Sequence, residues 1–237
     1  MRISGFLSSL VAAAVVSFGP ATFAATIDFD ALDSTAGQPL PLATFTEDGF
    51  TFGLTSEGSS SGPVIFNTFC TGYGSADGCN GDIDLVPGVA NTTGGNQGEN
   101  GIAGNILILQ EASGSPPIPN DDASANVVIL TLTSGPAFYF SGASAVDDGT
   151  FTFYSVIGAT TTLLGSITLA GDNDTGMTTF LSELIGIGDA IRIEYSGSGG
   201  IDALLVNPVP LPAALPLLLA ALAGLGLFGW RRRHAAA

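Results

Sequence analysis

The chain has 237 residues, of which 21 are acidic and five are basic, for a formal net charge of −16. Every acidic residue lies between Asp28 and Asp202, where Arg192 is the only basic residue, so this stretch carries −20, and the chain has no lysine. Such a surface repels phosphate groups, which excludes nucleic acid and anionic lipid headgroups as partners. Cations and neutral glycans stay open, beside the plainer interpretation that the charge keeps an exported domain soluble.

The N-terminus has the pattern of a secretory signal peptide. Met1 and Arg2 supply a positive start, an apolar run follows from Gly5 to Phe18, and Ala21-Thr22-Phe23-Ala24 offers small residues where signal peptidase reads. The apolar run is too short for a permanent membrane span. We therefore expect a signal peptide over residues 1–24, cleavage after Ala24 and export of the rest.

Residues 25–208 suit one domain, built from short runs with period-two alternation or β-branched and aromatic enrichment. Turn residues such as Glu47-Asp48-Gly49 and Asp147-Asp148-Gly149 separate the runs. The predicted strands are Thr26–Phe29, Ala43–Thr46, Phe50–Leu54, Val64–Phe69, Ile106–Gln110, Val127–Thr133, Ala137–Phe140, Thr150–Val156, Thr161–Ala170, Ala190–Tyr195 and Ile201–Val206. Thr178–Leu184 suits a short helix or a strand equally.

This pattern predicts an all-β fold, a jelly-roll-type β-sandwich ectodomain made of two packed antiparallel sheets. The segment from Gly88 to Gly104 has almost no apolar residue to bury and is expected to be a long surface loop. Asp172-Asn173-Asp174-Thr175-Gly176 begins like a calcium loop, and Glu183 stands at its twelfth position, but the glycine comes one position early. An ordinary Asx turn is the better interpretation.

Cys70 and Cys79 lie nine positions apart among glycines in a chain that we expect to be exported. A structural disulfide is the default for two such cysteines, and closing so short a loop would stabilise the fold by about 2–3 kcal/mol. A redox role is disfavoured because the Cys-x-x-Cys spacing is absent.

Catalytic chemistry has few residues to use. The only histidine is His234, far from the strand-rich body, so a Ser-His-Asp or Cys-His arrangement is excluded there, as is an imidazole zinc site. Carboxylate pairs of the glycosidase kind remain. The local candidates are Asp82 with Asp84, Asp121 with Asp122, and Asp147 with Asp148. Neighbouring aspartates in glycine-rich segments are typical of turns, so we do not expect an enzyme.

The C-terminal tail combines three elements in order: a short proline-rich motif, an apolar span and a basic end. From Val209 to Trp230 there are 22 residues without charge, long enough for one helix to cross the hydrocarbon core of a bilayer. Arg231, Arg232 and Arg233 follow directly and favour the cytoplasmic side. The sequence thus predicts a single transmembrane helix, with the body outside and residues 234–237 as a short cytoplasmic tail.

The same tail resembles the PEP-CTERM sorting signal of Gram-negative bacteria, in its Val-Pro-Leu-Pro-Ala variant. The motif is formed here by Val209, Pro210, Leu211, Pro212 and Ala213. The resemblance covers residues 209–233 and implies recognition by exosortase, a membrane protease that processes its substrates near the motif. The alternative is a plain membrane anchor with a proline-rich collar. The motif here replaces the Pro-Glu-Pro motif of the family, and this difference leaves open which exosortase recognises it and where it cuts.

The body looks like the jelly-roll sandwiches often attached to this tail and like carbohydrate-binding modules of the same architecture. The likeness rests on Ile27-Asp28-Phe29-Asp30, on Glu47–Phe52 and on Gly200–Val206. In such modules acidic residues on the first and last strands often hold a structural calcium ion. The likeness implies Asp28, Asp30 and Asp202 as its ligands here, and calcium does prefer such oxygen donors. Solvated aspartates at strand ends are the alternative.

We therefore expect a noncatalytic protein of the cell surface or extracellular matrix. It would be made as a precursor tethered to the inner membrane, processed by signal peptidase and exosortase, and then held at the surface or released. A carbohydrate-binding module that is stabilised by calcium and acts in exopolysaccharide is the alternative function, with a polysaccharide as its partner.

Overall fold

The computed structural model describes residues 24–32, 42–58, 60–68, 85, 104–111 and 122–209, apart from the side chains of residues 172 and 173. These residues belong to one compact unit, Phe23–Val209, and form ten strands without a helix. The strands are β1 (Ala25–Ile27), β2 (Thr44–Glu47), β3 (Phe50–Glu57), β4 (Pro63–Asn67), β5 (Asn105–Leu109), β6 (Ala125–Ser134), β7 (Phe138–Ile157), β8 (Thr160–Ile185), β9 (Ala190–Ser196) and β10 (Gly200–Pro208).

The described strands form one antiparallel sheet in the order β2-β3-β6-β9-β7-β10-β5-β4, with β1 added beside β10 and β8 beside β7. β7 connects the two arms of this sheet. Its first half, Phe138–Val146, pairs with β10, and its second half, Thr150–Val156, pairs with β9. The order of strands therefore continues to β6, β3 and β2 from one half of β7 and to β10, β5 and β4 from the other.

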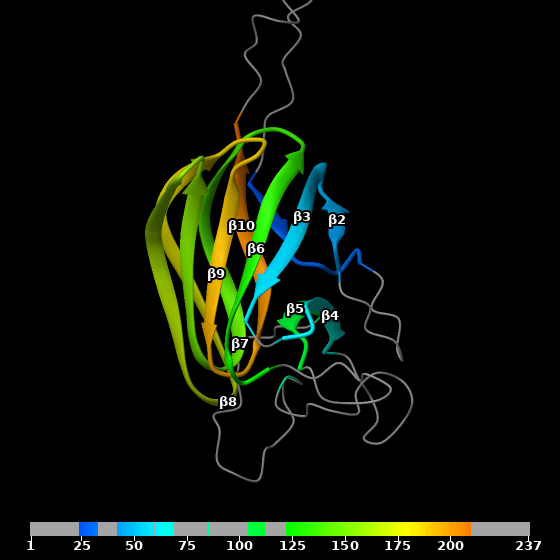
Figure 1. Ribbon diagram of the computed structural model, residues 1–237, viewed down its shortest axis with the longest axis vertical. Coiled ribbons are helices and arrows are strands. Elements are labelled where there is room, and N and C mark those ends of the chain that lie inside the picture. The colour runs from blue at the N-terminus through cyan, green and yellow to red at the C-terminus, as the bar shows by residue number, and fades with distance from the viewer. Residues whose placement is uncertain are drawn as a thin grey trace, which may run out of the picture. The chain divides into compact units, whose positions relative to one another are not determined.

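The sheet curls at β7, so that the two arms face each other in a β-sandwich-like arrangement. Figure 1 shows β9, β6 and β3 in front and β10 behind them. The bend coincides with Asp147 and Gly149, which have positive φ angles of 82° and 103°. β8 follows β7 through both halves, with Gly171–Asp174 unpaired opposite the bend. A long bent hairpin thus closes one side of both arms.

Phenylalanine rings join the two arms. The Phe138 ring on one arm lies edge-on to Phe50 on the other, with centroids 5.2 Å apart, and 6.0 Å from Phe52. Phe140 and Phe153, from the two halves of β7, are 6.2 Å apart. All five side chains are fully buried, as period-two strands with one apolar face require.

Phe180 fills the space inside the bent hairpin. The pairing of β7 with β8 shifts between Phe140 and Gly142, and this bulge turns Phe180 toward Phe140 and Phe153, at 5.2 and 5.1 Å. A Cβ on Gly165 would lie 2.7 Å from the Phe180 ring. Only glycine therefore lets the two halves of β8 approach closely across this ring.

A second, smaller core lies on the other side of β5. The five residues of β5 are all buried, because Leu107 and Leu109 face the main core while Ile106 and Ile108 face away from it. The smaller core consists of Val64, Phe66, Leu85, Ile106, Ile108 and Val146. A strand that is buried on both faces reads as a continuous apolar run.

The all-β prediction is confirmed for the described residues, and most predicted strands lie within one or two residues of the observed ones. The turn predicted at Asp147-Asp148-Gly149 is wrong, because these residues form the bend within continuous strand β7. Thr178–Leu184 is strand and belongs to β8. The Asx turn predicted at Asp172–Gly176 lies in the same strand, where the Asp174 carboxylate accepts hydrogen bonds from the backbone N–H groups of Ala170 and Thr175.

The aromatic contact between the arms gives a direct test. Replacing buried Phe138 with alanine should lower the free energy of unfolding by about 3–5 kcal/mol. The substitution leaves a cavity where the two arms pack together, so both arms lose contacts. Tyr139→Ala, at the next and 43 % exposed position, should cost about 1 kcal/mol or less. Denaturant unfolding of both variants measures the difference. Equal losses would show that Phe138 is not part of a shared core.

Candidate functional site

Four acidic residues lie near the paired strands β1 and β10. Asp28 and Asp30 follow β1, Glu47 ends β2, and Asp202 lies near the start of β10. We call these four residues the acidic junction. β1 pairs with β10 with Ile27 opposite Leu204, which brings Asp28 next to the Asp202 region of β10. Three of the four are the residues that the likeness to carbohydrate-binding modules implied as calcium ligands, and Glu47 is the fourth.

Glu47 holds the turn that follows β1. Its two carboxylate oxygens accept hydrogen bonds from the backbone N–H groups of Asp28, at 3.3 Å, and of Phe29, at 3.1 Å. Glu47 alternates with Phe45 on the inward-facing side of β2 and is buried. A buried carboxylate is stable only when such donors satisfy it.

Phe29, in this turn, has an unusual backbone conformation. Its φ angle is +62°, in the left-handed region that a bulky residue rarely adopts, while its ring is fully buried against Phe45 at 5.6 Å. The Phe29 carbonyl accepts hydrogen bonds from the backbone N–H of Leu32 and from Asn105 Nδ2. Each backbone polar group of Phe29 is therefore bound, and the ring anchors the turn in the core.

Asp30 connects the junction to the start of β5. Its Oδ1 accepts a hydrogen bond of 2.7 Å from the backbone N–H of Asn105. Gly104 lies directly beneath this carboxylate with a φ angle of 139°, and a Cβ there would lie 2.0 Å from Asp30 Oδ1. Thr68 Oγ1 donates to the Gly104 carbonyl at 2.7 Å. Glycine at 104 thus lets the carboxylate approach the backbone closely.

Burial and neighbouring charges raise the pKa of two junction carboxyls. For Glu47 the causes are first burial and then a hydrogen bond with the Asp28 side chain, and together they raise its pKa to about 7. Burial also raises the pKa of Asp202, and the charges of Asp30 and Asp28 add to it, while a 2.9 Å hydrogen bond from Ser144 Oγ opposes the shift.

The junction as it stands is held by hydrogen bonds. Among the described residues, no three histidine, cysteine, aspartate or glutamate side chains form a group that could hold a metal ion. Three of the carboxylates point at least one oxygen toward backbone N–H groups, and the Asp202 oxygen faces Ser144. The arrangement therefore does not fit a preformed calcium site, and the calcium prediction stays a prediction.

Where the structure describes the aspartate pairs proposed as glycosidase candidates, their carboxylates accept hydrogen bonds from the backbone or are buried. Asp122 Oδ1 accepts from the Ser124 N–H at 2.9 Å, and Asp148 Oδ1 accepts from the Ser198 N–H at 3.2 Å. Asp147 is buried at the bend of β7. Asp82, Asp84 and Asp121 lie outside the described residues, as do Cys70 and Cys79.

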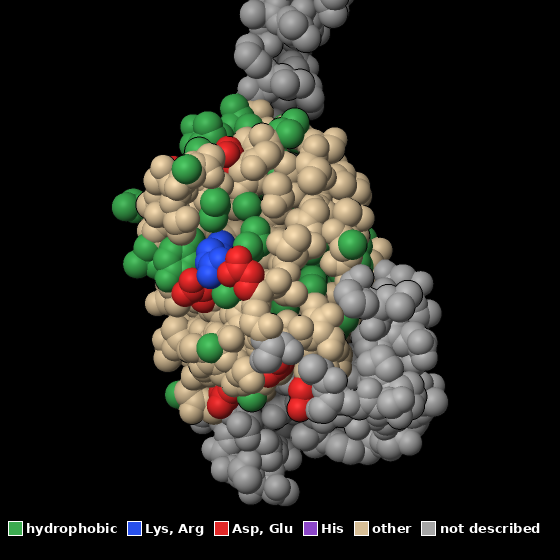
Figure 2. All heavy atoms as spheres, in the orientation of Figure 1, with side chains coloured by type: hydrophobic (Ala, Val, Ile, Leu, Met, Phe, Trp, Pro, Cys, Tyr) green, Lys and Arg blue, Asp and Glu red, His purple; other side chains and the backbone are tan. Residues whose placement is uncertain are grey.

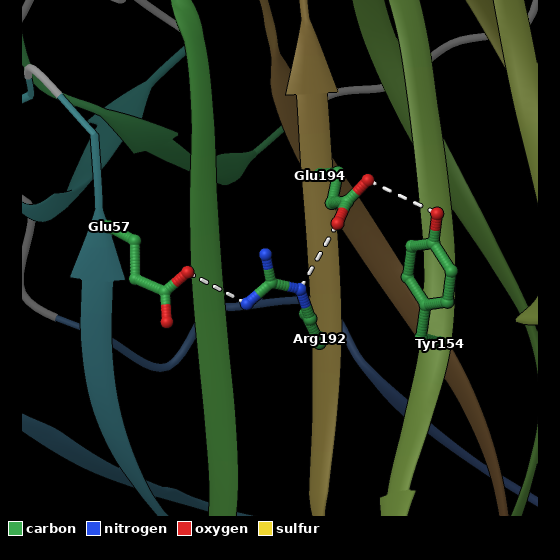
Figure 3. A network of polar contacts seen from close by, with 4 residues as sticks. All are labelled: Glu57, Tyr154, Arg192 and Glu194. Carbon is green, nitrogen blue, oxygen red and sulfur yellow. Dashed lines mark hydrogen bonds and ion pairs between the residues drawn. The ribbon is translucent and has the colours of Figure 1, made fainter. Parts of the chain in front are cut away.

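A second polar cluster lies on the solvent-facing side of the front arm and was not singled out by the sequence analysis. Arg192 on β9 donates to Glu57 on β3 at 2.8 Å and to Glu194 at 3.2 Å, and the Tyr154 hydroxyl on β7 donates to Glu194 at 3.1 Å (Figure 3). Figure 2 shows one patch of basic side chain, in blue, with red acidic side chains beside it on this face. The cluster crosses the sheet from β3 to β7.

The electrostatics of this cluster follow from its one cation. The hydrogen bond with Glu57 is the main cause that raises the pKa of Arg192. Partial desolvation, followed by the hydrogen bond with Glu194, raises the pKa of Tyr154. Exposed ion pairs typically contribute about 0–1 kcal/mol, so the cluster contributes little to stability. The one feature of the sequence that could have pointed to this cluster is that Arg192 is the only basic residue between Asp28 and Asp202.

The described residues contain no helix that is long and apolar enough to cross a membrane. The predicted span and its basic end lie outside those residues, apart from Val209, whose backbone N–H donates to the Ala137 carbonyl at 2.8 Å. Compared with known proteins, the sequence matches no family model. It also matches none of the curated proteins.

The raised pKa of Glu47 predicts how stability changes with pH. The folded state binds the Glu47 proton up to about pH 7, whereas an unfolded glutamate releases it near its ordinary value of about 4.3. Its contribution is therefore complete below that ordinary value and is lost as pH rises through 7. Unfolding followed by circular dichroism from pH 5 to 8 should show this loss, in the same direction as that from Asp202.

Glu47→Gln separates this effect from the general acidity of the chain. The amide resembles the protonated carboxyl, so the variant should lose less stability between pH 5 and 8 than the wild-type protein does. Glu183→Gln removes one charge from β8, away from the junction, and should keep the wild-type slope. A wild-type slope in Glu47→Gln would show that Glu47 does not hold a proton in the folded state.

Proposed function

We propose that this chain is a noncatalytic protein exported to the cell surface or the extracellular matrix, which exosortase processes at Val209–Ala213. The observation that carries the proposal is the order of the tail: proline-rich motif, 22 uncharged residues, then three arginines. Each part has a physical role, since the apolar stretch is long enough to span and the arginines favour the cytoplasmic side. In this proposal the precursor is tethered in the inner membrane with residues 25–208 outside.

The borders of the folded unit agree with this proposal. β1 begins at Ala25, directly after the expected signal peptidase site, and β10 ends at Pro208, directly before the motif. Removal of residues 1–24 would leave every described strand whole. A cut within or after the motif would do the same. Processing at both ends is therefore compatible with an intact body.

We further propose that the body is a jelly-roll-type sandwich. The support is the long β7–β8 hairpin that both arms share, together with the aromatic contacts that join the arms. Jelly rolls are double-sheet sandwiches whose strands extend from one sheet into the other. The proposed role is then that of a stable, acidic surface module.

The residue types of the body support a noncatalytic role. Between residues 25 and 208 the sequence has no histidine and no lysine. The described carboxylates of the proposed pairs bind backbone N–H groups, as turn-forming aspartates do. Acid–base chemistry would need a carboxyl group directed toward a substrate.

A second candidate is the carbohydrate-binding module with structural calcium. The observation in its favour is that β1 pairs with β10, with Ile27 opposite Leu204, which places Asp28 and Asp30 beside the part of β10 that carries Asp202. Calcium would have to draw these carboxylates away from their present hydrogen bonds. Polysaccharide pull-down with the full chain, with and without chelator, separates the candidates: saturable binding that chelator abolishes favours the module, and no binding favours the surface protein.

The sorting proposal is tested at its prolines. Pro210→Ala combined with Pro212→Ala should leave the full-length precursor in the membrane fraction, because the motif is changed while the apolar length is kept. Pro216→Ala makes the same kind of change within the span and should be processed like the wild-type chain. Immunoblotting of membrane and surface fractions, with intact-mass measurement of the mature protein, reports both. Normal processing of the double variant would overturn exosortase recognition.

A further inference from the structure

The proposed tether leaves the body without a spacer. Val209 is the first residue of the uncharged stretch that ends at Trp230, and its backbone N–H still donates to the Ala137 carbonyl at 2.8 Å. A helix over this stretch covers about 33 Å, and the hydrocarbon core of a bilayer is about 30 Å thick. A tether of this kind uses almost the whole stretch. The end of the body that carries Val209 then lies at the membrane surface.

Two apolar side chains lie beside the start of the tether on the arm of β10. Asn207 on β10 pairs with Tyr139 on β7, and Tyr139 pairs with Leu184 on β8. Because paired strands lie about 4.8 Å apart, Tyr139 and Leu184 lie about 5 and 10 Å from β10 in the same row. Both side chains are 43 % exposed. This row is two residues before Val209 along β10.

The front arm adds two more apolar side chains at the same end. The link from β8 to β9 runs from Ile185 to Ala190 and carries Ile187, which is 67 % exposed. Val156 pairs with Ala190, so the turn after Val156 lies beside this link, and its Ile157 is 36 % exposed. Figure 1 shows the end of β10, in orange, at the same end of the body as the end of β6, and Figure 2 shows green hydrophobic side chains there. We call the following four residues the apolar rim: Tyr139, Ile157, Leu184 and Ile187.

The rim holds four of the seven large apolar side chains that are exposed among the described residues. The other three, Leu163, Met177 and Leu181, lie on β8 further from this end. Exposed apolar side chains that gather at one place indicate an interaction surface. Tyr139 favours a membrane as the partner, because the amphipathic ring of tyrosine suits the level of the lipid headgroups.

Many acidic residues lie at the opposite end of the body. Asp147 and Asp148 lie at the bend of β7, Asp174 is opposite this bend on β8, and Asp202 is near the start of β10. The first half of β7, Phe138–Val146, covers about 30 Å, which is more than three Debye lengths of about 8 Å at physiological ionic strength. A membrane at the rim is therefore too far from these carboxylates to repel them.

The acidic residues nearer the rim select the kind of lipid. Asp48 is in the turn between β2 and β3, Glu183 directly precedes Leu184, and Asp189 is in the link after β8. The Asp189 carboxylate accepts a hydrogen bond of 3.0 Å from the backbone N–H of Gly186, within the link. Carboxylates beside an apolar surface favour neutral headgroups over anionic ones.

We propose that the apolar rim inserts into the headgroup layer of the bilayer while the chain is tethered, with the acidic bend of β7 directed away from the membrane. This inference rests on the proposed tether. A few apolar side chains bind a membrane only weakly, but the tether makes their contact intramolecular and so raises the effective concentration of lipid. A cut at the motif removes this advantage, and the released body leaves the membrane.

Quenching by lipid tests where the rim lies. Ala159, in the turn after Ile157, and Ala125, at the start of β6 at the opposite end, are both exposed. Ala159→Trp and Ala125→Trp are each made in the full chain with Trp230→Phe, so that the new tryptophan is the only one. Both are reconstituted in vesicles of phosphatidylcholine, with and without bromine on the acyl chains. Brominated lipid should lower the emission of Ala159→Trp and leave that of Ala125→Trp unchanged.

Alkaline extraction of the same vesicles separates this proposal from the one on which it rests. A chain that alkali removes has no transmembrane tether, which would overturn both. A chain that stays in the vesicles, with both tryptophans quenched equally or neither quenched, would overturn the rim contact and leave the tether in place.

A pair of aspartate variants tests the apolar side chains themselves. Leu184 and Met177 are both exposed on β8, about 23 Å apart along the strand. In the Ala159→Trp chain, Leu184→Asp should weaken the quenching, because a carboxylate is unfavourable in the apolar layer. Met177→Asp makes the same charge change away from the rim and should keep it.

Cooperative thermal unfolding near the temperature of the parent chain checks that both aspartate variants fold. Quenching that both variants keep, or that both lose, would contradict insertion of the rim. Should Leu184→Asp fail to fold, the comparison of Ala159→Trp with Ala125→Trp decides alone.

Discussion

The fold depends on the hydrogen bonding of one strand. β7 pairs with β8 along one edge, and with β10 and then β9 along the other, so both arms of the sheet are built on it. The positive φ angle of Asp147 lets the strand bend without interruption. Because the arms share β7, the phenylalanine rings between them pack with centroids 5.2 to 6.2 Å apart, and moving one arm would disturb the packing of the other.

The acidic junction closes the opposite part of the same body by a different means. There the chain enters through a turn whose strained residue, Phe29, is fixed by its buried ring and by the Glu47 carboxylate. A carboxyl group that is both buried and next to Asp28 keeps its proton to about pH 7, so the stability of this turn varies with pH. The turn that follows β1, close to the proposed signal peptidase site, is thus held by a group that titrates.

Local pattern predicted the strands well and predicted their connections poorly. Phe50-Thr51-Phe52 and the apolar run of β5 are strands because alternation or continuous burial requires it. The middle of β7 escaped prediction, since Gly142–Val146 has small residues without alternation and is buried by strands distant in sequence. Two acidic residues followed by glycine at 147–149 resemble a turn, and only the pairing of Asp148 and Gly149 with β8 continues the strand through them.

The likeness to carbohydrate-binding modules singled out Asp28, Asp30 and Asp202 together, but it did not point to Glu47, whose carboxylate holds the turn after β1. Asp28, Asp30 and Asp202 are near one another because β1 pairs with β10, as expected for first and last strands. Glu47 was taken for a turn residue, although its place two residues after Phe45 puts it on the inward phase of β2. The network around Arg192 needed the order of β3, β6, β9 and β7, which no local pattern contains.

The place of β10 in the sheet has a mechanical consequence. It is the last described strand before the proposed tether, and it has neighbours on both edges: β7 on one, and β1 and β5 on the other. A pull at Val209 along the strand therefore loads these ladders in shear, with many hydrogen bonds strained together, instead of peeling them one at a time. Resistance to such a pull is set by the rate of forced unfolding, so a surface module anchored through β10 withstands drag on the cell better than one anchored through an edge strand.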